Sequence, residues 1–334
     1  MTTTNINIPL EVFNFSGQTW LETWCLQETI SKADVGEYSD WLVEEIPLCL
    51  QRIKDLADRF PFWQHRKRTG RPPVCERDLL IGFLIRVFFE STFRQTMALM
   101  SIFGEYFELE YIPHHTVLSR KNRSKRWQRI WKRFHSFLLN LIPVRKSVIA
   151  TDATGYSGRK KAWREVPYDV RANQNWIKLH ASIETGSFLI LNYTLSDSNV
   201  HDSKEFENVW KGLPGNVIPV RSLADNAYTS DECLNVVRGS NAIPINKIRK
   251  DAKYAHKPNT AYQKLVHFAK HWPNRYNALY GIRNHAETAF SMIDSRFGYR
   301  IRCRNKIGRK NEVQSKINSH NIRALACKEF LFGY

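Results

Sequence analysis

The hydrophobic positions of the first part of the chain recur at helical spacing. From Glu37 to Phe60 the pattern predicts a helix with a break at Pro47, because proline lacks the N–H group that an inner helical turn needs. The strongly apolar stretch Glu76–Glu90 predicts a buried helix, and a further helix is expected from Ser91 to about Gly104. The basic segment 66–73 is rich in turn residues and is typical of a linker.

A second helix is predicted after the turn at Pro113–His115, and the pair has two interpretations. The layout is that of a helix-turn-helix, and it is equally that of two packed helices. The second helix is expected to continue to Leu141, with an apolar stripe at 3.6-residue spacing. Its polar face carries eight Lys and Arg residues between Arg120 and Arg133. They predict contact with DNA, with a merely solvated face as the alternative. The residues selected for DNA contact are Arg120, Lys121, Arg123 and Lys125.

The second half of the chain has the pattern of alternating strands and helices. An apolar run from Ser147 predicts a buried strand that ends at Asp152, with a turn directly after it. Further strands are predicted at 176–183, 188–195, 216–225 and 242–247. Helices are predicted at 201–210, 231–237 and about 283–297, and the basic segment at about 248–278 is expected to form an irregular excursion.

This element order is that of the ribonuclease-H-like fold, a mixed five-stranded sheet with helices on both faces. We therefore predict a helical, basic DNA-binding region at residues 1–143 and a ribonuclease-H-like catalytic domain at 144–334. Asp152 and Asp225 each end a predicted strand, and Glu287 lies in the last predicted helix. In this fold those places meet at one edge of the sheet, so the three carboxylates are expected to converge.

The net charge adds a partner to this picture. The 334 residues carry 50 Lys and Arg against 32 Asp and Glu, a formal charge of +18, which favours nucleic acid as the partner. The six cysteines form no C-x2-C pair, so no zinc module is expected and a reducing cytoplasm fits. We recognise no signal peptide, and no run of about 20 apolar residues predicts a membrane span.

Three converging carboxylates in a basic protein suit two-metal phosphoryl transfer. Carboxylate oxygens are ligands that Mg²⁺ prefers, and two ions can hold the attacking and leaving oxygens of an in-line displacement. We predict that Asp152, Asp225 and Glu287 are catalytic and bind two Mg²⁺ ions, for which Mn²⁺ can substitute. Each acid alone has a structural alternative. A strand-end Asp often caps a turn or helix, and Arg283 with Glu287 is typical of an i,i+4 surface pair.

A motif in the last predicted helix points to a family. Helical spacing places Tyr280, Arg283, Glu287 and Asp294 on one face. The first three match the Tyr-x2-Arg-x3-Glu-x6-Lys signature, so the chain resembles DDE transposases of prokaryotic insertion sequences in the IS-four/IS-five-like group. Further segments that resemble this group are 94–95, 115–120, 151–155, 199–202, 223–228 and 321–323.

The resemblance implies a Mg²⁺-dependent DNA transposase with a ribonuclease-H-like catalytic domain. Such an enzyme binds terminal inverted repeats, cleaves double-stranded DNA at the element ends and transfers the 3′-ends to target DNA. A homodimer on paired ends and a location in the prokaryotic cytoplasm, at the nucleoid, are implied as well. The alternatives are a structure-specific nuclease of the same fold and a domesticated DNA-binding protein without catalysis.

Asp294 departs from the signature, which has Lys at this position. An Asp repels phosphate, so either Asp294 points to solvent while Arg296 or Arg300 replaces the Lys, or the site is weakened. Helical spacing disfavours Arg296, and Arg300 lies beyond Gly298, where the helix is expected to end. We therefore expect Tyr280 and Arg283 to contact the DNA phosphate, assisted by the basic loop after Asp152. The loop residues assigned to this contact are Arg159, Lys160 and Lys161.

Overall fold

The computed structural model describes residues 35–63, 74–158 and 176–332. The predicted linker at 66–73 and the predicted DNA contacts Arg159, Lys160 and Lys161 lie outside these residues. Within the described part of the chain, no helix combines the length and the apolar character needed to cross a membrane.

The described front half is helical, as predicted. Its helices are α2 (Val35–Arg59), α3 (Glu76–Phe88), α4 (Phe93–Ile102), α5 (His115–Asn122) and α6 (Lys125–Asn140). The predicted break at Pro47 is wrong, because α2 runs through it. A proline removes one backbone hydrogen bond, and the apolar stripe on both sides of it, including the buried Trp41 and Ile53, packs against one continuous core.

Local caps decide where the next helices begin. Thr92 and Gln95 form a reciprocal capping box at the start of α4, with distances of 2.9 and 3.3 Å. The prediction of one continuous helix from Pro113 to Leu141 is wrong. The Ser124 hydroxyl accepts a hydrogen bond from the backbone N–H of Trp127 and starts a new helix, α6, after the end of α5. The predicted stripe of α6 is buried from Trp127 to Leu138 except for the half-buried Phe137, whereas Leu141 is exposed.

The second half forms the predicted mixed sheet of five strands in the order β3-β2-β1-β4-β5. The strands are β1 (Arg145–Tyr156), β2 (Ile177–Glu184), β3 (Ile190–Asp197), β4 (Val217–Ala224) and β5 (Ile243–Pro244). β2 pairs antiparallel with β1 and β3, while β4 pairs parallel with β1 and β5. The predicted strand end at Asp152 is wrong. β1 continues four residues further because β2 pairs with it as far as Tyr156.

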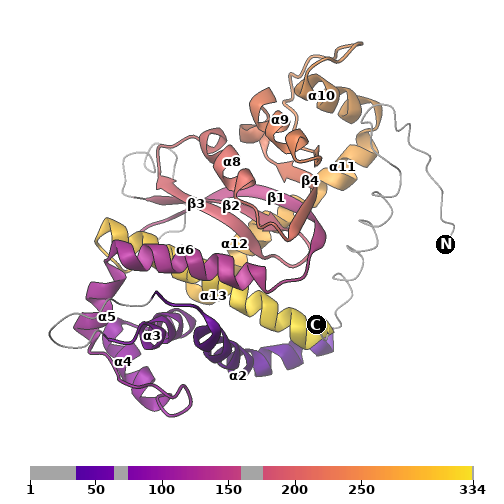
Figure 1. Ribbon diagram of the computed structural model, residues 1–334. Helices are drawn as coiled ribbons and strands as arrows, with labels where there is room; N and C mark the ends of the chain where they lie inside the picture. Colours follow the sequence, from indigo (N-terminus) through magenta and orange to yellow (C-terminus); the bar gives the residue numbers. More distant parts are fainter. Residues whose placement is uncertain (1–34, 64–73, 159–175, 333–334) are drawn as a thin grey trace.

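Helices cover both faces of the sheet (Figure 1). They are α8 (Asp202–Lys211), α9 (Asp231–Gly239), α10 (Ala261–His271), α11 (Pro273–Gly281), α12 (Asn284–Phe297) and α13 (Lys306–Phe332), with a short 3-10 helix, η3 (Asn226–Tyr228). In the view of Figure 1, α8 and α9 lie above the sheet, and α6 and α13 lie below it. The predicted irregular excursion at 248–278 is wrong in part, because it contains α10 and most of α11. Thr260 caps α10, and Pro273 occupies the first turn of α11, where its missing N–H is not needed.

The pattern analysis did not predict α13, which joins the two halves of the chain. It packs against α2, α3 and α6 of the front half and against β3 of the sheet. One apolar core runs through both halves, so the division near residue 143 stays a prediction.

The centre of α13 is both buried and polar. Every residue from Asn311 to Ile322 is buried, and most of these side chains are polar. The Asn311 amide donates to the backbone oxygens of Asn122 (2.8 Å) and Ser124 (3.2 Å). At the other end, the Asn321 amide donates to the Ile190 oxygen (2.8 Å) and accepts from the Ile190 N–H (2.9 Å). α13 thus satisfies backbone groups of the α5–α6 turn and of the edge strand β3.

We expect Asn321→Ala to destabilise the protein strongly. The substitution leaves the buried N–H and C=O groups of Ile190 without their partner, at about 1–3 kcal/mol for each group. Urea denaturation measures the loss in the free energy of unfolding. Asn235→Ala, on the exposed face of α9, is the matched control and should change stability by less than about 0.5 kcal/mol. Equal effects of the two variants would contradict the role assigned to Asn321.

Candidate active site

Two strands bring Asp152 and Asp225 to neighbouring positions. β1 and β4 run parallel, and Thr151 pairs with Ala224, so the residues that follow them are Asp152 and Asp225. Asp152 still lies inside β1, opposite Ala181 of β2. Asp225 follows the end of β4, and its carboxylate accepts a hydrogen bond from the backbone N–H of Ala227 at 2.8 Å. It thus caps η3, which is the structural alternative to a catalytic role, and the cap also fixes its position beside Asp152.

Arg283 connects the third acid to this pair. It lies at the N-terminus of α12, where its Nη1 donates to Asp152 Oδ2 at 3.2 Å and its Nη2 pairs with Glu287 one turn later. The Arg283 side chain is only 13% exposed, whereas that of Glu287 is 51% exposed. The structure therefore brings the three predicted acids to one region, with a guanidinium between Asp152 and Glu287.

The environment of Asp152 disfavours its charge. Burial is the main cause that raises the pKa of its carboxyl from 3.8 to about 6, and the negative charges of Asp225 and Glu287 act in the same direction. The Ala153 N–H, at 2.8 Å, and the charge of Arg283 oppose this rise without cancelling it. Additional positive charge beside Asp152 would favour its ionised form.

Tyr280 lies near the acids but on a different helix from Glu287. The expectation that one helix carries both residues is wrong, because α11 ends at Gly281 and α12 starts at Asn284. The Tyr280 ring stacks on Tyr276 at 5.8 Å, and burial raises the pKa of its hydroxyl to about 12. The charges of Arg283, Asp225 and Asp152 also act on this hydroxyl, so it lies within their electrostatic reach.

Residues 201–202 have two interpretations in the sequence, a role beside the sheet or a cap of the following helix, and the structure shows a charged group there whose β2 partners the sequence did not indicate. Asp202 does not cap α8, because the His201 ring accepts the hydrogen bond from Ser203 N–H. Instead, Asp202 pairs with Lys178 (2.6 Å) and contacts His180 (3.3 Å), both on β2. Although burial opposes ionisation, these partners hold the pKa of Asp202 below its ordinary value. In the pairing of β2 with β1, His180 lies opposite Ala153 and Ala181 lies opposite Asp152, so the side chains of His180 and Asp152 point to opposite faces of the sheet.

Tyr228 is a further residue that the pattern did not indicate. It is buried at the end of η3, and burial raises the pKa of its hydroxyl well above 10. The negative charges of Asp202, Asp152 and Asp225 add to this rise. The hydroxyl is a neutral hydrogen-bond donor in an acidic environment.

Of the two explanations for Asp294, the one in which it points to solvent does not fit the structure. Asp294 is half-buried, and its charge acts on the buried Tyr156 hydroxyl, whose pKa it raises, and on the buried Lys316. The two arginines considered as substitutes for the missing Lys are also engaged elsewhere. Arg296 pairs with Glu45, and Arg300 Nε donates to the Gly158 oxygen at 3.1 Å. Asp294 therefore faces buried groups of the protein and not open solvent.

The basic face of α5 and α6 is less uniform than the sequence predicted. Arg126 pairs with Glu76 of α3, so an acid from another helix balances part of the charge. Arg133 lies over the Trp63 ring at 4.1 Å. By contrast, the four residues selected as DNA contacts surround the α5–α6 turn, and no ion pair joins them to a described acid. These four are Arg120, Lys121, Arg123 and Lys125.

The donor set fits a divalent cation in part. Among the described residues, no three His, Cys, Asp or Glu side chains lie close enough together to hold a metal ion. Asp152 and Asp225 are suitable oxygen donors at adjacent positions, and the negative charges of Asp225 and Glu287 act on Asp152 as well. Glu287 is held by Arg283 and is the donor that would have to exchange its partner.

We expect Asp152→Asn to become more stable, relative to the wild type, as the pH rises from 4 to 7. The folded wild type holds a proton on Asp152 up to about pH 6, whereas the unfolded chain loses it near 3.8, so wild-type stability falls across this window. The gain corresponds to about 3 kcal/mol for this rise in pKa. Urea denaturation at both pH values measures it, and parallel pH dependences would contradict the prediction. Mg²⁺ at pH 7.5 should raise the melting temperature of the wild type and not that of the variant.

Comparison with known proteins assigns most of the second half of the chain to one family. The family model described as Transposase DDE domain matches residues 143–322, which is more than half of the chain and includes Asp152, Asp225 and Glu287. The searches of curated proteins and of solved structures find no match. The family match covers the whole sheet and extends into α13. The chain therefore belongs to the transposase DDE domain family.

Proposed function

We propose that the protein is a DNA transposase of a prokaryotic insertion sequence, with a ribonuclease-H-like catalytic domain. It binds terminal inverted repeats, cleaves DNA at the element ends and joins the 3′-ends to target DNA. The observation that carries this proposal is the adjacency of Asp152 and Asp225 at the ends of paired parallel strands, with Arg283 linking Asp152 to Glu287. The sheet order and the family match support it.

The side chains of the site have different proposed roles. Asp152, Asp225 and Glu287 are the proposed catalytic residues and the ligands for divalent cations, Mg²⁺ in the first place. Bound cations would activate the attacking oxygen and stabilise the leaving 3′-oxygen. Arg283 holds two of the acids in place and, with Tyr280, faces the DNA phosphate.

Double-stranded DNA is the proposed partner, both as element ends and as target. The formal charge of +18 supports a polyanionic partner, and the exposed cations at the α5–α6 turn are available for phosphates. A homodimer that holds two ends together is part of the proposal, because joining both ends of an element to one target requires two active sites near each other.

Each of the variants Asp152→Asn, Asp225→Asn and Glu287→Gln should abolish DNA cleavage and leave DNA binding nearly intact. An amide keeps the shape of the carboxylate and loses the charge that would hold a cation. Cleavage of a labelled end fragment and a gel-shift titration measure the two properties. Asp251→Asn, at an exposed carboxylate, is the control and should cleave like the wild type. Near-normal cleavage by any of the three variants would remove that residue from the site.

We expect Arg283→Ala to move the acid limb of the cleavage pH profile upward. Arg283 lowers the pKa of Asp152, so its loss makes this carboxyl ionise only at a higher pH. Turnover at neutral pH should also fall by at least about 1 kcal/mol of transition-state stabilisation, the low end for a lost charge-assisted hydrogen bond. Arg283→Lys keeps the positive charge but cannot contact Asp152 and Glu287 at once. Its acid limb and turnover should therefore lie between those of the wild type and of Arg283→Ala. An unchanged acid limb in Arg283→Ala would show that the guanidinium does not act on Asp152.

A structure-specific nuclease of the same fold is the second candidate, since the same acids suit hydrolysis alone. A strand-transfer assay with pre-cut ends separates the two functions. Joined products support the transposase, and cleavage without joining supports the nuclease. A domesticated protein without catalysis would bind DNA and show no Mg²⁺-dependent nicking.

A further inference from the structure

The segment that connects α12 to α13 is held in place from its inner side. It begins at Gly298, which has a φ of +69°; a side chain there would come within 2.9 Å of the Glu90 carboxylate, so glycine is required. The chain then runs beside the end of β1, where the N–H of Ile301 donates to the Ser157 oxygen at 2.8 Å. Ile301 is buried, and Cys303 is half-buried beneath α5.

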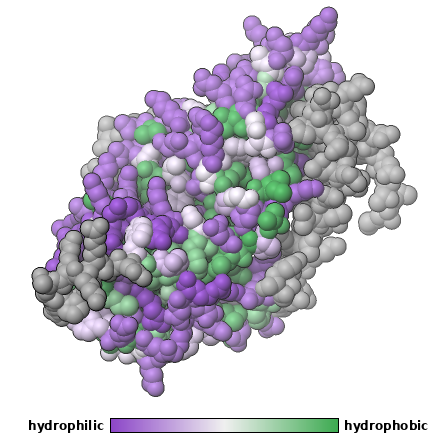
Figure 2. Space-filling view, viewed as in Figure 1, coloured by the Kyte–Doolittle hydropathy of each residue, from purple (hydrophilic) through white to green (hydrophobic). Residues whose placement is uncertain are grey.

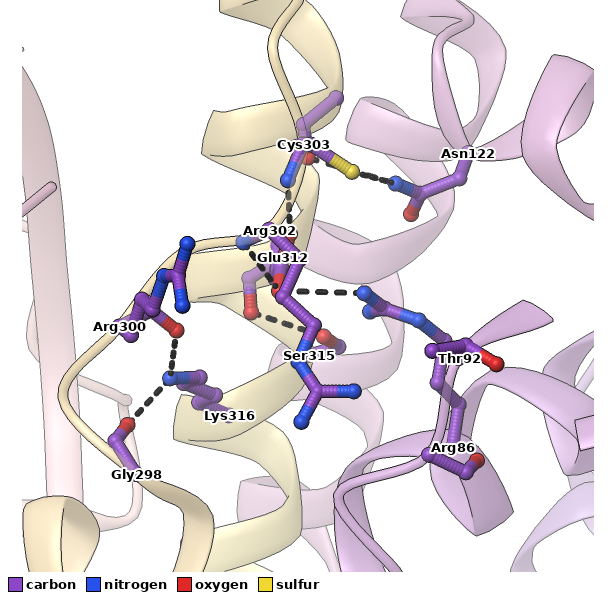
Figure 3. Close-up of polar contacts among 12 residues, drawn as sticks. Arg86, Thr92, Asn122, Gly298, Arg300, Arg302, Cys303, Glu312, Ser315 and Lys316 are labelled. Atoms are coloured by element: carbon purple, nitrogen blue, oxygen red, sulfur yellow. Dashed lines mark hydrogen bonds and ion pairs between the residues drawn. The ribbon is translucent and has the colours of Figure 1, made fainter. Parts of the chain in front are cut away.

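Buried charges of α13 fix the backbone of this segment (Figure 3). The Glu312 carboxylate accepts from the N–H groups of Arg302 and Cys303 at 3.1 and 3.0 Å, and it pairs with Arg86 of α3 at 3.1 Å. The Lys316 ammonium donates to the carbonyl oxygens of Gly298 and Arg300. The inner side of the segment is therefore satisfied by protein, and its conformation is set before any ligand arrives.

Three arginines occupy the outer side. Arg300, Arg302 and Arg304 are all exposed and alternate with Ile301 and Cys303, as in an extended strand. Successive outward side chains in such a segment start about 6.6 Å apart. Within the described residues, no carboxylate forms an ion pair with any of the three. Arg300 and Arg302 also border a cavity of about 220 Å³ in front of Arg86 and Lys316.

This segment packs against the basic α5–α6 turn. The Asn122 amide donates to Cys303 Sγ (3.1 Å) and to the Gly308 oxygen (3.4 Å). A side chain on Gly308 would come within 3.1 Å of Arg123 Cγ, so the two backbones pass close to each other. The cations of both segments therefore share one surface. Figure 2 shows that the visible face of the molecule is mostly hydrophilic, with apolar residues in separate groups.

We propose that Arg300, Arg302 and Arg304 form, together with the cations of the α5–α6 turn, one continuous track for the backbone of double-stranded DNA. This inference rests on the proposed function and adds to it the path of the DNA. Phosphate is the ligand that exposed arginines on a fixed backbone recognise when no described carboxylate pairs with them, and a row of them suits a repeating phosphate chain. Arg300 already donates its Nε to the Gly158 oxygen, so its other nitrogens would contact the phosphate. The contacts carry no base specificity, so the track positions the duplex and does not select the sequence.

The track lies away from the reacting phosphate. Glu287 and Phe297 are separated by ten residues of α12, which corresponds to about 15 Å along the helix. Arg300 follows just beyond that end. The track therefore holds DNA that flanks the cleavage site, and its loss should weaken binding without slowing the chemical step at saturation.

The test is the triple variant Arg300→Ala/Arg302→Ala/Arg304→Ala, measured against a nonspecific duplex at several salt concentrations. Three lost phosphate contacts should lower the slope of log affinity against log salt by about 2.7 and weaken binding at least about tenfold at 0.1 M salt. The matched control, Lys204→Ala/Lys211→Ala/Arg238→Ala, removes the same charge from α8 and α9 above the sheet and should leave the slope within about one unit.

Three outcomes would overturn the track. The first is an unchanged slope of log affinity against log salt in the triple variant, and the second is an equal change of that slope in the control. The third is a loss of affinity for single-stranded DNA only. Circular dichroism verifies that both variants fold. Single-turnover cleavage with saturating protein should stay within about twofold of the wild type, and a large fall at unchanged affinity would also contradict the proposal. If the wild type binds no duplex at all, the proposed function itself fails, so the two failures are distinct.

Discussion

The polar hydrogen bonds of α13 are the interaction on which the rest of the structure depends. This helix is buried from Asn311 to Ile322, yet its side chains are largely amides, hydroxyls and charges. Asn311 binds the backbone of the α5–α6 turn, and Asn321 binds both backbone groups of Ile190 on the edge strand β3. One helix thus supplies hydrogen-bond partners to backbone groups at a sheet edge and at a helix turn, which would otherwise lack them. The front helices and the sheet are thereby fixed relative to each other.

The same helix orients the surroundings of the acids indirectly. Glu312 and Lys316 hold the segment after α12, and α12 carries Arg283 at its start and Glu287 one turn later. At the centre of this arrangement, burial raises the pKa of Asp152, and Arg283 opposes the rise only in part. A buried carboxyl with a raised pKa lowers the stability of the folded protein when it is ionised. Groups with strongly shifted pKa values are common at functional sites.

Several features were predictable because they are local. The apolar runs of the strands, the capped helices and the acids that follow the apolar runs all follow from residue order. The errors arose where a neighbour in space overrode the local pattern. β1 passes Asp152 because β2 pairs beyond it, and the long basic helix divides because Ser124 caps a second one. Pro47 was expected to break α2, and the packing of the helix on both sides of it decided otherwise.

The sequence by itself determined the sheet, the helical front half, the positive charge and the identity of the acids, because hydrophobic period and residue chemistry are carried by neighbouring residues. Tertiary structure alone decided that α13 exists as a buried helix, since its polar side chains find partners only in distant backbone. It also decided that Asp294 turns inward to Tyr156 and that Arg283 reaches Asp152. The physical reason is common to all three: buried polar groups require hydrogen-bond partners, and these partners lie far away along the chain.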